Sequence, residues 1–166
     1  MAFLNDWGKP ENDPGEWIAA GKDGLRTVKC KIRAIPDDML RMLLKRHFKN
    51  EKVDTASGRA SMPVASSWED TFKFGVDRAI WALVDTEEFF VRINDEESGR
   101  FYAKATGRND QPFEVGEEVC LDGKWTDGIR EHVLSKNGRF RQWVLDQAES
   151  VAKRANEHIA ELEGNS

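Results

Sequence analysis

A stripe of apolar residues at helical spacing runs along the C-terminal part of the chain. Positions three and four apart lie on one face of an α-helix, so the stripe predicts a single helix from about Arg139 to Leu162. The residues after Ala152 are sparsely apolar, and we expect this end of the helix to project or fray. The stripe consists of Phe140, Val144, Gln147, Val151, Ala155, His158, Ile159 and Leu162, with Trp143 and Ala148 beside it.

A second strongly marked region lies nearer the N-terminus. Residues 27–35 alternate between apolar and basic positions, which is typical of a strand with one buried face. Pro36 then suits the first turn of a helix over residues 36–50, where its missing N–H costs nothing. Asp37 and Asp38 complement the positive end of that helix, and basic residues close it. The apolar face of the strand carries Val28, Cys30 and Ile32.

The remaining elements are predicted from shorter patterns. Residues 51–67 are small and polar and predict a loop, and a serine at its end caps a helix over 68–84. Two alternating runs within 89–105, separated by an Asn-Asp and Ser-Gly turn, predict a β-hairpin. A short apolar run over 115–121 follows, with Val119 and Leu121 as its buried candidates. Thr126 then caps a helix over 127–136, which Asn137-Gly138 ends.

These elements predict an α+β fold: a mostly helical single domain with a small antiparallel sheet or hairpin and a long C-terminal helix. Residues 1–26 are rich in Gly, Pro, Asn and Asp and show no sustained period, so we expect an irregular N-terminal arm. Residues 27–152 form the globular α+β domain. Residues 153–166 are the end of the C-terminal helix and a frayed tail.

Charge and composition narrow the class of protein. The 166 residues carry a net charge of −5, which argues against nonspecific binding of nucleic acid. Basic residues crowd the region 29–49, but Asp37 and Asp38 flank them and only Phe48 interleaves as a stacking residue. We interpret this region as a solvated basic face. The N-terminal residues do not resemble a signal peptide and no stretch is long enough to span a bilayer, so we expect no membrane partner and a cytoplasmic protein.

No catalytic pattern is present. The sequence has no phosphate-binding loop and no HExxH, and His47, His132 and His158 lie on separate predicted helices. We interpret Cys30 and Cys120 as buried free thiols, although a disulfide between them stays open. The acidic pairs fall in predicted turns and not across a cleft. We therefore expect a protein that is not an enzyme and that binds neither a cofactor nor a metal.

Three phrases of the sequence resemble the tail assembly chaperones of long-tailed, siphovirus-like bacteriophages. They are the opening TVKCKIRAIPDDMLRMLLKRHFK, the central DRAIWALVDTEEFFVRI and the closing LDGKWTDGIREHVLSKNGRFRQWVLDQAESVA. The likeness spans about residues 27–152. It implies a protein of the infected host's cytoplasm that binds the tape measure protein, keeps its hydrophobic helices soluble and helps to recruit tail tube protein. It also implies self-association, and it supplies no catalytic residues.

The partner-binding residues are predicted among exposed aromatic positions. The candidates are Trp7, Trp17, Trp125, Phe140 and Trp143, each of which could instead belong to the core. We interpret Trp68 and Trp81, which lie off the stripe of their helix, as the rim of the core. Three alternatives stay open: a virion structural protein such as a head–tail connector or tail completion subunit, a small inhibitory or regulatory binding protein, and last an enzyme.

Overall fold

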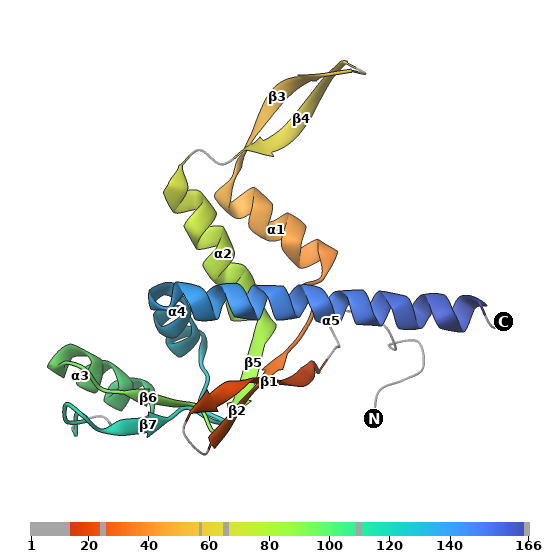
Figure 1. Ribbon diagram of the computed structural model, residues 1–166. Coiled ribbons are helices and arrows are strands. Elements are labelled where there is room, and N and C mark those ends of the chain that lie inside the picture. Colours follow the sequence, from red (N-terminus) through yellow and green to blue (C-terminus); the bar gives the residue numbers. More distant parts are fainter. Residues whose placement is uncertain (1–13, 24–25, 57, 65–66, 109–110, 165–166) are drawn as a thin grey trace.

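The computed structural model describes residues 14–23, 26–56, 58–64, 67–108 and 111–164 (Figure 1). Its helices are α1 (Asp37–His47), α2 (Trp68–Ala82), α3 (Glu96–Ala105), α4 (Asp127–Lys136) and α5 (Gly138–Gly164). Its strands are β1 (Glu16–Asp23), β2 (Arg26–Ile32), β3 (Lys49–Thr55), β4 (Gly58–Val64), β5 (Leu83–Glu87), β6 (Phe90–Arg92) and β7 (Glu118–Cys120). The strand pairs are antiparallel. The predicted α+β fold with a small antiparallel sheet and a long C-terminal helix is confirmed.

The main sheet has three strands in the order β1-β2-β5, and its first strand corrects the prediction of an irregular arm over residues 1–26. The register of β1 against β2 shifts between Ala19 and Gly21. Gly21 has a φ of +150°, a conformation that glycine adopts readily. This irregularity breaks the alternation of period two that would have marked the strand. Residues 1–13 lie outside the described residues.

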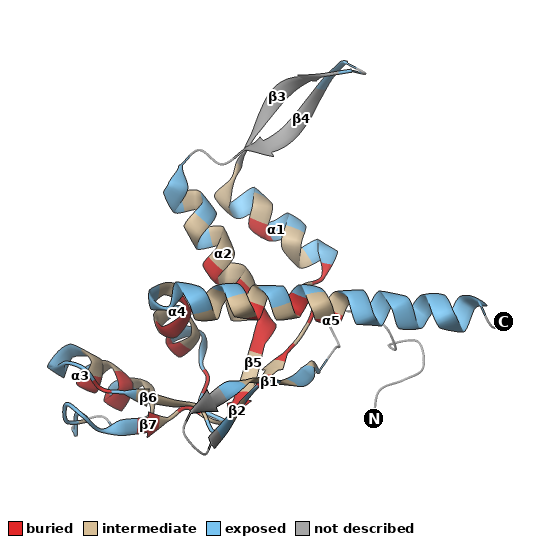
Figure 2. Cartoon of the chain, in the orientation of Figure 1, coloured by how far each residue is buried: buried red, intermediate tan, exposed pale blue. Residues whose placement is uncertain are grey.

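The core lies where α5 passes over the main sheet and packs against α2 and α4 (Figures 1 and 2). Val144, Ala148 and Val151 of α5 are buried, which confirms the inward face predicted by the helical stripe. The N-terminal half of α5 is therefore held by burial of apolar surface on several elements at once. The other largest fully buried side chains include Ile32, Leu83, Ile93, Leu121, Ile129 and Leu134.

A β-hairpin replaces the loop predicted over residues 51–67. Strands β3 and β4 pair from Lys49 opposite Val64 to Thr55 opposite Gly58. Figure 1 shows the hairpin projecting from the ends of α1 and α2, and its two strands make their extensive contacts with each other. Strands that do not pack on the core are not required to alternate apolar and polar residues, so the sequence carried no period-two signal here.

A helix also replaces the second strand of the hairpin predicted over residues 89–105. Asp95 is the N-cap of α3, and its Oδ1 accepts a hydrogen bond of 2.7 Å from the backbone N–H of Ser98. The first predicted strand survives as β6, which pairs with β7 and places Val91 opposite Val119. The acidic turn was thus the start of a helix, because an aspartate followed by glutamates is also a helix-start pattern.

The closing elements follow the sequence pattern closely. Thr126 caps α4 by accepting a 3.2 Å hydrogen bond from the N–H of Ile129, and α4 ends at Lys136 as predicted. Helix α5 remains regular to Gly164, so the expected fraying over residues 153–166 is not seen within the described part of that range. Its last three turns project beyond the domain as an exposed helix, which is the other outcome expected for this end (Figure 2). Residues 165 and 166 lie outside the described residues.

Candidate partner-binding surface

The aromatic residues predicted to bind a partner do not form one surface. Trp125 is only 8% exposed and belongs to the core, which corrects its prediction as an anchor. Phe140 and Trp143 are half-buried; their rings stack 6.1 Å apart, and Phe140 also contacts Phe89. We therefore assign these three residues to packing and not to partner binding. Trp7 lies outside the described residues.

Trp17 is the one predicted anchor that the described residues leave substantially exposed, at 44%. It lies on β1 opposite Lys31, whose ammonium nitrogen is 5.9 Å from the centre of the Trp17 ring. In the same sheet Lys31 lies opposite Asp85, and Lys29 lies opposite Glu87. Basic and acidic residues therefore alternate across this part of the sheet, which supports the interpretation of the basic residues as a solvated face.

The most exposed large hydrophobic side chain in the described part of the chain is Trp68, at 78%. Its ring stacks on Phe72, one turn along α2, with centroids 5.3 Å apart and an interplanar angle of 19°. The guanidinium of Arg141, on the first turn of α5, lies 4.8 Å from the centre of the Phe72 ring. We call Trp68, Phe72 and Arg141 the Trp68 ledge. The interpretation of Trp68 as the rim of the core is wrong.

Local sequence features fix the geometry of the Trp68 ledge. Ser67 is the N-cap of α2 and accepts a hydrogen bond of 3.2 Å from the N–H of Asp70, which places Trp68 in the first turn. Arg141 donates from Nη1 to the carbonyl of Leu134 at 2.7 Å, so its guanidinium is held against the end of α4. A tryptophan that stacks on a neighbouring ring loses less conformational freedom on binding, which favours affinity.

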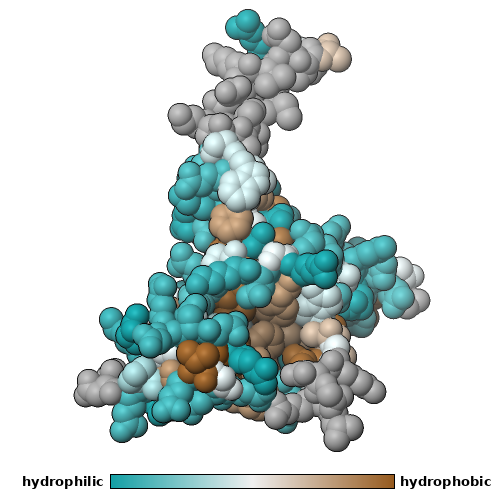
Figure 3. Space-filling model, turned by 60° about the vertical axis from the view of Figure 1, so that its left-hand side comes forward, coloured by the Kyte–Doolittle hydropathy of each residue, from teal (hydrophilic) through white to brown (hydrophobic). Residues whose placement is uncertain are grey.

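Figure 3 shows that apolar side chains also gather in the middle of one face of the molecule, below the projecting hairpin and surrounded by hydrophilic residues. Several hydrophobic side chains that pack against the core are only partly buried. Contiguous apolar surface of this kind marks interaction sites better than single residues do.

The described residues show no arrangement for nucleophilic or metal chemistry. Burial raises the pKa of Cys30 to about 12. Burial, together with the neighbouring Asp122, also raises the pKa of Cys120, so both thiols stay protonated at neutral pH. Both are free; Cys30 is buried as predicted, whereas Cys120 is only half-buried. Within the described ranges, no group of three or more His, Cys, Asp or Glu side chains is placed to hold a metal ion.

A surface hollow of about 680 Å³ lies between α3 and residues 111–115. Glu96 and Arg100 form an ion pair of 4.0 Å beside it, and the Arg108 guanidinium lies 4.2 Å from the centre of the Phe113 ring. These charged groups are engaged by neighbours on the hollow's own rim. The contacts described for these groups are with one another and with Phe113, and they give no recognisable catalytic arrangement.

Asp122 links the turn after β7 to the turn between β5 and β6. Its carboxylate accepts hydrogen bonds from the Thr86 hydroxyl at 2.8 Å, the N–H of Glu88 at 2.7 Å and the N–H of Phe89 at 3.1 Å. Glu88 has a φ of +58°, an uncommon conformation for a residue with a side chain. The Asp122 carboxylate therefore holds a strained turn in place, which is a structural role and was not foreseen from the sequence.

Replacing Asp122 with asparagine is expected to lower the free energy of unfolding by about 1–2 kcal/mol at pH 7. The pKa of the carboxyl is below its ordinary value of 3.8, because donated hydrogen bonds outweigh the effect of burial, which alone raises it. The contribution of the Asp122 carboxylate to the free energy of unfolding is therefore present above pH 3.8 and is lost as the pH falls through the lowered pKa. Urea unfolding should show a difference from wild type at pH 7 that shrinks as the pH falls below the ordinary value of 3.8. A variant that is as stable as wild type at pH 7 would contradict this role.

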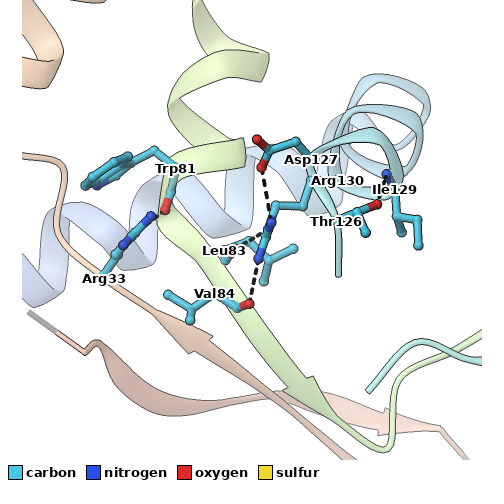
Figure 4. Close-up of polar contacts among 8 residues, drawn as sticks. All are labelled: Arg33, Trp81, Leu83, Val84, Thr126, Asp127, Ile129 and Arg130. Atoms are coloured by element: carbon cyan, nitrogen blue, oxygen red, sulfur yellow. Dashed lines mark hydrogen bonds and ion pairs between the residues drawn. The ribbon is translucent and has the colours of Figure 1, made fainter. Parts of the chain in front are cut away.

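Two arginines bind the carbonyl groups at the junction of α2 and β5 (Figure 4). Arg130 of α4 donates from Nε to the carbonyl of Leu83 at 2.7 Å and from Nη2 to that of Val84 at 2.8 Å. Arg33, just after β2, donates from Nε to the carbonyl of Trp81 at 2.7 Å. Its guanidinium lies 3.7 Å from the centre of the Trp81 ring. We call Arg33 and Arg130 the arginine clamp, and it ties the segment after β2 and helix α4 to the junction of α2 and β5.

Comparisons of the chain with models of known protein families, with curated proteins and with solved structures found no match. No helix in the part of the chain that the structure describes is both long enough and apolar enough to cross a membrane.

Proposed function

We propose that this chain is a bacteriophage tail assembly chaperone that works in the cytoplasm of the infected host. In this role it binds the tape measure protein, assists assembly of the tail tube and self-associates. The resemblance of residues 27–152 to such chaperones supports the proposal. The structural observation that supports it most is Trp68, which is 78% exposed on a capped helix and backed by Phe72. Such a side chain suits an apolar helix of a partner.

Co-expression with the tape measure protein tests this proposal. We expect a several-fold increase in the amount of tape measure protein in the soluble fraction, because a bound chaperone covers apolar surface that would otherwise aggregate. A tape measure protein that is equally insoluble with and without this chain would overturn the proposal.

Replacing Trp68 with alanine should remove most of this solubilising effect. Trp68 is a surface residue, so the variant should unfold at nearly the same denaturant concentration as wild type, with a change within about 0.5 kcal/mol. Trp17→Ala is the matched control, because it removes an exposed tryptophan from a different surface. Soluble tape measure protein is quantified for each variant; retention of the full effect by Trp68→Ala would exclude the Trp68 ledge as the binding surface.

A virion structural protein, such as a head–tail connector or tail completion subunit, is the second candidate. The projecting β3–β4 hairpin favours it, because an isolated two-stranded hairpin is only marginally stable in water and gains most from docking on a neighbour. Mass spectrometry of purified virions separates the two candidates. The chaperone proposal predicts that the chain is absent from finished particles, and recovery in stoichiometric amounts would favour the structural protein.

A further inference from the structure

The projecting end of α5 continues the same stripe that buries the helix in its own domain. Within the domain the stripe is made of Val144, Ala148 and Val151, which are buried. Beyond it, alternating steps of four and three residues lead to Ala155, His158 and Leu162. All six positions fall within an arc of about 100° on the helix surface. Steps of three and four on one face are the pattern of a coiled-coil seam.

This projecting seam is exposed in the single chain. Leu162, the last seam position, is 61% exposed, and Ile159 beside the seam is 43% exposed. Both belong to the few large hydrophobic side chains of the described residues that remain so accessible. The helix nevertheless stays regular to Gly164. Large apolar residues at and beside the seam, on a helix that has left its own core, indicate a surface to be covered by another helix.

The charges beside the seam identify a second copy of this chain as the occupant. Arg154 and Glu161 are seven residues apart and therefore flank the seam on the same side. When two copies of α5 run antiparallel, Arg154 of each copy lies near Glu161 of the other, and two opposite-charge pairs form. A parallel pairing gives neither residue an opposite charge across the seam.

Arg154 is already positioned for this contact. Its Nε and Nη2 donate to Oε2 of Glu16 on β1, at 3.1 and 2.7 Å. This bond holds the guanidinium at the point where α5 leaves the sheet. It leaves Nη1 to donate to a carboxylate of a second copy, so the side chain pays less conformational entropy when the copies meet.

We propose that the projecting end of α5, residues 153–164, pairs antiparallel with the same segment of a second copy. This inference deepens the proposed function, from which it takes the expectation of self-association, by naming the surface and its direction. The segment is only about 18 Å long. Such a pairing buries less area than a standard stable interface of about 1,600 Å². The dimer is therefore weak and concentration-dependent.

Sedimentation velocity over about 1–200 μM protein tests the association. The weight-average sedimentation coefficient of the wild type should rise with concentration, and that of Leu162→Asp should stay at the monomer value. Ala160→Asp is the matched control, since it adds the same charge on the opposite face of the same turn. Wild-type protein that stays monomeric, or a Leu162→Asp variant that associates as wild type does, overturns the proposal.

Cysteine cross-linking in a Cys120→Ser background tests the direction. The antiparallel pairing of residues 153–164 places Ala155 of one copy beside Leu162 of the other, so Ala155→Cys/Leu162→Cys should form a disulfide-linked dimer under mild oxidation. The two copies of residue 162 would lie about 10 Å apart along the axis, so Leu162→Cys alone should not cross-link. Cross-linking by Leu162→Cys alone indicates a parallel pairing. That result, or a double variant that does not cross-link, overturns the proposal.

The two proposals fail separately, because Leu162→Asp leaves the Trp68 ledge untouched. A monomeric wild type that still solubilises the tape measure protein overturns only the pairing of α5. A dimer that forms through α5 without any effect on tape measure protein overturns only the chaperone function.

Discussion

Replacing Trp125 with alanine is expected to lower the free energy of unfolding by about 3–5 kcal/mol, which is a large part of the stability of a domain of this size. The Trp125 indole is 8% exposed. Its N–H donates to the hydroxyl of Thr86 at 2.8 Å, and its ring meets the edge of Phe89 at 5.2 Å. Alanine would leave a cavity and also remove the donor to a buried hydroxyl. Chemical unfolding followed by circular dichroism measures the loss.

Trp125→Phe separates the two contributions. Phenylalanine keeps most of the ring packing and loses the N–H donor, so this variant should lose about 1–2 kcal/mol. Trp17→Ala serves as the surface control and should change stability by about 0.5 kcal/mol or less. If Trp125→Ala were as stable as Trp17→Ala, Trp125 would not be a core residue. It would then again be a candidate for partner binding.

Replacing Arg130 with alanine is the second substitution with a large expected effect, a loss of about 3 kcal/mol in the free energy of unfolding. The Arg130 side chain is 16% exposed and is the hydrogen-bond donor to the carbonyls of Leu83 and Val84. Hydrogen bonds from charged groups contribute about 1.5–3 kcal/mol each, and partly buried carbonyls left without a donor are costly. Equilibrium urea unfolding gives the difference.

Lysine should not restore the stability of the Arg130 variant. Its ammonium group is a single point of charge and cannot reproduce the planar pair of donors that reaches two adjacent carbonyls. Asp127→Ala is the control, because Asp127 pairs with Arg130 at 3.2 Å but its own side chain is 89% exposed; this pair should contribute about 0–1 kcal/mol. Full rescue by lysine would contradict the geometry of the arginine clamp.

Elements with one buried face were predictable from the sequence, because burial imposes a period on the residues. The face of α5 that carries Val144 and Val151 follows a helical period, and β2 alternates around Cys30 and Ile32, all of which are buried. Helix α4 was bounded correctly by its cap at Thr126 and its stop at Asn137. These are local patterns, which burial of one face and the caps at the helix ends impose on neighbouring residues.

The errors fall where burial does not impose a period or where two signals coincide. Strand β1 is interrupted at Gly21, and the β3–β4 hairpin stands away from the core. In α3 the same acidic residues are compatible with a turn and with a helix start. Only the pairing of β6 with β7, far apart in the sequence, decides between them. Contacts at long sequence separation of this kind are not encoded in any local pattern.

The candidate site was harder to predict than the fold, because exposure depends on what surrounds each aromatic residue. Trp125 and Trp68 both lie near the start of a helix, yet one is 8% and the other 78% exposed. Trp125 precedes α4 inside the turns held by Asp122, whereas Trp68 opens α2 on the side away from the core. The position of Trp68 ahead of the apolar stripe of α2 was the one available signal.

A fluorescence titration with soluble segments of the tape measure protein tests most directly whether Trp68 binds the partner. Tryptophan emission of the wild type should shift to shorter wavelength as Trp68 leaves water. Trp68→Phe should show little shift, and Trp17→Phe should keep it. Unchanged emission of the wild type at saturating segment, or an equal shift in wild type and Trp68→Phe, would contradict the assignment of the Trp68 ledge as the partner-binding surface.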